Sequence, residues 1–87
     1  MSTVIDGIII QRISFLQEQI RASNKPAVNK MFQLQIDMLQ AADLSKLDKL
    51  IEWKKKEVKG CVDAHESERL FTELEALEWL QRQVRRL

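Results

Sequence analysis

The sequence predicts an all-α fold, a small bundle of about four helices in a single domain that covers residues 1–87. Residues that favour helices dominate the chain, which has only two glycines, one proline and no tyrosine. Apolar residues recur at spacings of three and four, which is the period of an α-helix. Turn and cap residues at Pro26, Ser45 and Gly60 divide the chain into segments of helical length.

The first expected helix covers residues 3–22. Thr3 followed by Asp6 is typical of a helix start. One face then carries apolar residues at helical spacing, which are Ile5, Ile9, Ile13, Leu16 and Ile20. Beside this face lie Val4, Ile8 and Phe15. The apolar surface therefore covers about half of the circumference, more than a helix packed on one side needs.

The second expected helix covers residues 26–42. Pro26 suits the first turn of a helix, and it disfavours helical backbone at Lys25 before it. Apolar residues fill more than half of the circumference, and they are Val28, Met31, Phe32, Leu34, Ile36, Met38, Leu39, Ala41 and Ala42. We therefore expect this helix to be buried on several sides.

The third expected helix covers residues 46–59. Asp43 and Ser45 are both good N-cap residues, and Ser45 with Asp48 three positions later resembles a capping box. Gly60 is suited to the first position after the C-cap, where helices often need a residue without a side chain.

The fourth expected helix covers residues 64–87, because Asp63 followed by Glu66 is typical of a helix start. Its apolar stripe consists of Leu70, Leu74, Leu77, Leu80, Val84 and Leu87. The loops are short, so neighbouring helices are expected to be antiparallel. In an alternative fold, the third and fourth helices fuse through Gly60 at a cost of about 1 kcal/mol and form a long helical hairpin.

The composition favours binding over catalysis. The formal net charge of +1 argues against a polyanion binder with basic charge over its whole surface. The single cysteine, Cys61, cannot form an intrachain disulfide, and the single histidine, His65, cannot build a zinc site within one chain. We therefore expect no cofactor and no metal.

No segment predicts a targeting signal or a membrane span. The apolar run at residues 8–10 is interrupted at once by Gln11 and Arg12, and no window approaches the roughly 18 apolar residues that a span requires. A free cysteine suits a reducing compartment. We expect a cytoplasmic protein without membrane contact.

Self-association is expected from the size of the chain. A domain of 87 residues buries only roughly 60% of the surface of its unfolded chain, and this one lacks disulfides and metals. The broad apolar arcs of the first two helices then predict a homo-oligomer, in the simplest case a dimer. The candidate self-association residues are Ile8, Phe15, Met31, Leu34 and Met38. The alternative is a central helix in a tightly packed monomer.

The two tryptophans are candidates for contact with another protein. On a helical wheel, Trp79 lies opposite the stripe of the fourth helix, and Trp53 lies well away from the stripe of the third. Tryptophan is enriched at binding hot spots. The candidate partner-binding residues are Trp79, Phe71, Arg82, Glu75 and Trp53. The alternative is that each indole belongs to a second core face.

The third helix also carries a basic face, formed by Lys46, Lys49, Trp53 and Lys56 at spacings of three and four. Lysines can neutralise phosphates while an indole stacks on an exposed base, as in proteins that bind single strands. Acidic residues are interleaved on the same helix, so the alternative is an ordinary solvated surface.

The sequence thus predicts a non-enzymatic module for protein–protein interaction, such as a small adaptor, an assembly chaperone or an inhibitor that docks on a larger protein. The first alternative is a helical protein that binds nucleic acid through the basic face. A more remote alternative is a metal site or an enzyme centred on Cys61 and His65, which would share a face if both were helical.

Overall fold

The computed structural model describes residues 3–87 and contains, within them, four α-helices and one short 3₁₀ helix. These are α1 (Thr3–Ala22), α2 (Pro26–Ala41), η1 (Leu44–Lys46), α3 (Leu47–Gly60) and α4 (Ala64–Arg86). The all-α prediction is confirmed, and each helix lies within one residue of its predicted bounds. The fused hairpin is wrong, because the backbone is extended at both Cys61 and Asp63.

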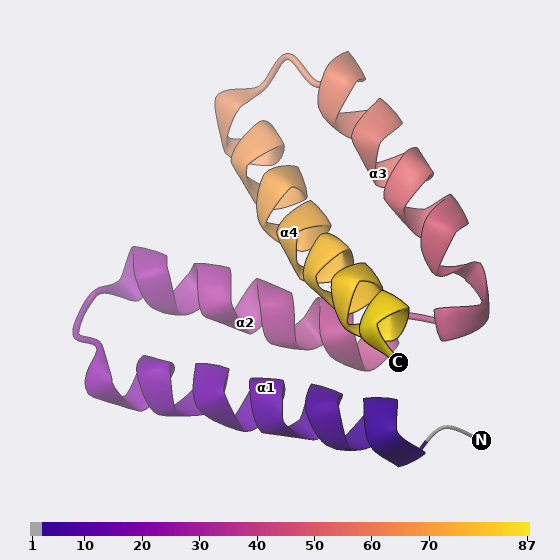
Figure 1. The fold of residues 1–87 in the computed structure, drawn as a ribbon. Helices are drawn as coiled ribbons and strands as arrows, with labels where there is room; N and C mark the ends of the chain where they lie inside the picture. Colours follow the sequence, from indigo (N-terminus) through magenta and orange to yellow (C-terminus); the bar gives the residue numbers. More distant parts are fainter. Residues whose placement is uncertain (1–2) are drawn as a thin grey trace.

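The helices form two antiparallel hairpins, α1 with α2 and α3 with α4, and α4 crosses over α2 (Figure 1). α4 contacts each of the other three helices, whereas α3 contacts α4 but neither α1 nor α2. The described chain is flattened, with dimensions of 39 × 33 × 18 Å. α3 is therefore an edge helix, and most of its circumference has no neighbour in the molecule.

The core lies where the two hairpins meet, and α4 contributes most to it. The largest fully buried side chains of the core are Leu16, Leu77 and Leu80. The remaining buried apolar residues are Ile5, Ile36, Leu39, Leu47, Ile51, Leu70, Leu74 and Ala76. α2 packs against both α1 and α4, which accounts for its broad apolar arc within one molecule.

The turn between α1 and α2 follows the sequence prediction. Lys25 has extended backbone, with φ −102° and ψ 108°, as expected of a residue before proline. Its backbone N–H donates a hydrogen bond of 3.2 Å to the Ser23 hydroxyl. Pro26 then begins α2 with its φ already suited to a helix.

The start of α3 differs from the prediction, because Ser45 does not form a capping box with Asp48. The Asp43 carboxylate accepts hydrogen bonds from both the backbone N–H and the hydroxyl of Ser45, at 3.0 and 2.7 Å. These two bonds hold the pKa of Asp43 below its ordinary value of 3.8. The Ser45 hydroxyl is thus engaged with Asp43, and the Asp48 carboxylate accepts a hydrogen bond of 2.7 Å from Gln81 on α4.

At the break between α3 and α4, the start of α4 was predicted correctly and the end of α3 was not. Asp63 caps α4, since its carboxylate accepts hydrogen bonds from the backbone N–H groups of His65 and Glu66. The prediction for Gly60 is wrong, because Gly60 is the last residue of α3 and its φ is not positive. Cys61 ends the helix instead, with extended backbone and its N–H bonded to the carbonyl of Val58 at 3.3 Å.

Candidate binding surface

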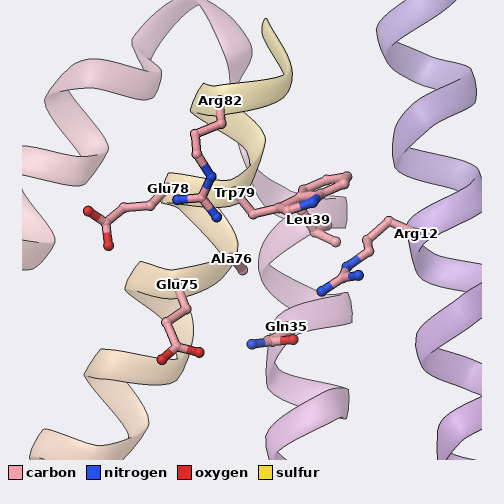
Figure 2. Close-up of a pocket in the computed structure, with 8 residues that line it drawn as sticks. All are labelled: Arg12, Gln35, Leu39, Glu75, Ala76, Glu78, Trp79 and Arg82. Atoms are coloured by element: carbon pink, nitrogen blue, oxygen red, sulfur yellow. The ribbon is translucent and has the colours of Figure 1, made fainter. Parts of the chain in front are cut away.

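A pocket of about 190 Å³ lies between α1, α2 and α4. Figure 2 shows the Trp79 ring extending from α4 toward the Arg12 side chain of α1, with Leu39 of α2 beside it. The pocket is lined by Arg12, Gln35, Leu39, Glu75, Ala76, Glu78, Trp79 and Arg82. Three helices therefore contribute to one concave surface.

Trp79 is half-buried and packs against the hydrophobic core. The prediction that its ring points away from the core is wrong. The wheel of the fourth helix identified one apolar stripe, but α4 is covered on two sides, by α3 and by the α1–α2 hairpin. Thr72 and Ala76 are buried as well, although they lie outside the predicted stripe.

The sequence analysis did not indicate Arg12 as a pocket residue, nor Gln35, Ala76 and Glu78. The guanidinium carbon of Arg12 lies 5.2 Å from the ring centroid of Phe15 and 5.2 Å from that of Trp79, within the range of cation–π contacts. Arg12 is half-buried, and no carboxylate of the described residues lies within 4.0 Å of it. The only signal in the sequence was a charged residue three positions before an aromatic one on the same helix.

The other candidate partner-binding residues are not all brought together. Glu75 and Arg82 line the Trp79 pocket. Phe71 is 51% exposed and shares the outer face of α4 with them, but it does not line the pocket. Trp53 is 68% exposed on α3, which touches neither α1 nor α2. The structure therefore places the two tryptophans on separate surfaces.

The candidate self-association residues do not form one surface, and two of them, Ile8 and Met38, pack against the core. Phe15 is 47% exposed and lies beside Arg12. On α1, Ile8 lies one helical turn before Arg12 and two turns before Phe15. Met31 and Leu34 line a second pocket, of about 480 Å³, between α2 and the beginning of α4.

A cluster of ion pairs, which no sequence signal indicated, joins α3 to α4. The Glu73 carboxylate lies 3.5 Å from Lys54 Nζ of α3 and 3.4 Å from a guanidinium nitrogen of Arg69. Arg69 also pairs with Glu66, and this hydrogen bond lowers the pKa of Glu66 and raises that of Arg69. These contacts hold the α3–α4 hairpin and do not reach the Trp79 pocket.

Cys61 and His65 do not share a helical face, since Cys61 precedes α4. The Cys61 thiol donates a hydrogen bond of 3.4 Å to the carbonyl of Asp63. Among residues 3–87, no three histidine, cysteine or acidic side chains are grouped so that they could hold a metal ion. In the same part of the chain, no helix has the length and apolar character needed to cross a bilayer.

The fold and the pocket thus define a small all-α domain of four helices whose central helix, α4, presents a half-buried tryptophan to an arginine that has no ion pair with residues 3–87. Comparison of the chain with protein-family models, with curated proteins and with solved structures gives no match.

The two tryptophans are expected to differ in their access to solvent. Iodide should quench the emission of Trp79, measured in a Trp53→Phe variant, less strongly than that of Trp53, measured in a Trp79→Phe variant. The physical reason is that Trp79 is half-buried against the core, whereas 68% of Trp53 is exposed. Equal quenching of the two residues would contradict the placement of Trp79.

Proposed function

We propose that the protein is a non-enzymatic interaction module that binds a helix of a partner protein at the Trp79 pocket. The observation that carries the proposal is the position of Arg12, half-buried between two aromatic rings and without an acidic partner among the described residues. An adaptor, an assembly chaperone and an inhibitor would all use such a surface, and the proposal does not choose among them.

The chemistry of Arg12 indicates what the partner must supply. The N–H groups of a guanidinium point outward in its plane. For Arg12, no carboxylate of the described residues lies within 4.0 Å to accept from them. Two parallel hydrogen bonds to a carboxylate use this geometry best. The partner is therefore expected to present an aspartate or glutamate to Arg12.

An apolar stripe of α1 continues from the pocket and indicates the rest of the partner's chemistry. Phe15 is 47% exposed, Val4 is 59% exposed, and the two lie three helical turns apart on one face. A helix that carries one acidic residue among apolar ones, at spacings of three and four, would match this stripe and Arg12 together. Tryptophan and arginine at its centre are the residues most often found at hot spots.

The proposal can be tested by placing a photo-crosslinking amino acid at Phe15 or at Arg82, on two sides of the pocket, in cells that normally make the protein. Both positions are expected to give an adduct with the same partner. Arg12→Glu should reduce both adducts at least tenfold, because it sets a carboxylate against the partner's carboxylate. Because Arg12 is half-buried, the circular dichroism spectrum of the variant is needed to show that the helices are retained.

Trp53 provides the control, since a crosslinker there is also exposed but lies on the separate α3 surface. Adducts from position 53 alone, or adducts that survive Arg12→Glu unchanged, would contradict the proposal. An adduct with twice the mass of the chain would show instead that the pocket is occupied by a second copy, as in the predicted homodimer.

Self-association and a cytoplasmic location remain part of the proposal. For self-association, the support is the apolar residues that stay exposed outside the Val4–Phe15 stripe, Ile10 of α1 and Met31 of α2. For the location, the support is the unpaired thiol of Cys61, which a reducing compartment would preserve.

A further inference from the structure

The outer face of α3 concentrates exposed lysines that form no ion pair with the described residues. Four of its lysines, together with Lys46 of η1 just before it, are exposed and have no carboxylate within 4.0 Å among residues 3–87; the four are Lys49, Lys55, Lys56 and Lys59. The exception is Lys54, which pairs with Glu73 and Glu57. This charge is local, because the net charge of the whole chain is only +1.

The acidic residues of α3 do not cancel this charge. The Glu57 carboxylate lies 3.9 Å from Lys54, and the Asp48 carboxylate accepts a hydrogen bond from Gln81 at the α4 side. Glu52 is then the one carboxylate of α3 without a partner among the described residues. The exposed face is therefore net positive along its length.

The basic face continues onto α4. Lys46, Lys49 and Arg85 line a pocket of about 400 Å³ between the beginning of α3 and the end of α4. The one acidic residue that also lines it is Asp48, whose carboxylate accepts the hydrogen bond from Gln81. Arg85 is exposed and makes no ion pair with a described residue. Cations from two helices thus border one concavity, and the pocket extends the lysine face beyond a single helix.

Trp53 lies in the middle of this face. Its side chain is 68% exposed, and between positions 49 and 59 it is the sole exposed apolar residue. A helix that lies in a membrane surface needs a broad apolar face, which α3 already uses against α4 through Leu47 and Ile51. A single indole among lysines instead matches a ligand that has phosphates and a stacking surface.

We propose that the outer face of α3, together with Arg85, binds single-stranded nucleic acid. Lys49 and Lys56 are two helical turns apart, about 10 Å along the axis. They contact phosphates of one strand, while an unpaired base stacks on Trp53 between them. A duplex keeps its bases stacked on one another and offers the indole no free base face. This inference does not depend on the Trp79 pocket, which lies between α1, α2 and α4 and shares no residue with this surface.

The test is a titration of a fluorescently labelled oligothymidylate with the purified protein at low salt, followed by fluorescence anisotropy. We expect binding that is accompanied by quenching of the protein's tryptophan emission, and no quenching in Trp53→Phe. Trp53→Ala should weaken binding about tenfold, because one base loses its stacking surface. The double variant Lys49→Glu/Lys56→Glu should weaken it more strongly and reduce the slope of log K against log salt by about 1.4.

The matched control is Arg21→Glu/Lys30→Glu, which makes the same change in charge at exposed positions on α1 and α2. It should retain most of the affinity. The proposal is overturned if the oligonucleotide does not bind at low salt, or if this control loses as much affinity as the α3 variant. It is also overturned if a duplex binds as tightly as the single strand, or if the protein binds anionic vesicles but no oligonucleotide.

Discussion

Leu80→Ala is expected to destabilise the protein by about 2–5 kcal/mol, the range for truncation of a fully buried leucine. Leu80 has no exposed surface, and it lies on α4, the helix that touches the other three. The loss combines the transfer of apolar surface with the cavity that remains. It is large for a domain of 87 residues, whose whole stability is typically about 9 kcal/mol.

Val84→Ala is the matched control, because Val84 lies one turn after Leu80 on the same helix but is 40% exposed. We expect its cost to be below about 1 kcal/mol. The measurement is urea unfolding followed by circular dichroism, with the free energy of unfolding taken from the transition. If both variants cost the same, α4 would not be the central element of the core.

Helix boundaries could be predicted from the sequence because local residues determine them. Pro26 begins α2 through its own ring geometry, and Asp63 begins α4 through hydrogen bonds to residues two and three positions later. The start of α3 was harder to predict, because Asp43 and Ser45 are equally good N-cap residues. Which of them acts depends on the Ser45 hydroxyl, which donates to Asp43.

The Trp79 pocket could not be predicted, because it depends on how helices far apart in the sequence pack. A wheel describes one helix and contains no information about its neighbours. Trp79 meets Arg12 only because α4 crosses the α1–α2 hairpin. The exposure of Trp53 could be predicted, because α3 packs on one side only. A helical wheel with one buried side is then enough to say which residues are exposed.

Glu73→Ala is expected to weaken the attachment of α3 and to cost about 1.5–3 kcal/mol, the range for hydrogen-bonded charged groups. The Glu73 side chain is only 12% exposed, and its carboxylate lies 3.5 Å from Lys54. In the variant, the Lys54 ammonium has no carboxylate partner on α4, although it is only 18% exposed. Glu68→Ala is the control, since Glu68 is exposed on the same helix and its carboxylate makes no ion pair with a described residue.

Amide hydrogen exchange would show which helices Glu73→Ala destabilises. α3 has no contact with α1 or α2, so it can separate from α4 while the α1–α2 hairpin stays packed against α4. Amide exchange of α3 in the native protein should therefore be faster than that of the buried part of α4. Glu73→Ala should accelerate exchange in α3 and leave α1 and α2 almost unchanged. Uniform acceleration along the chain would mean that the four helices unfold as one unit, with α3 as firmly held as the rest.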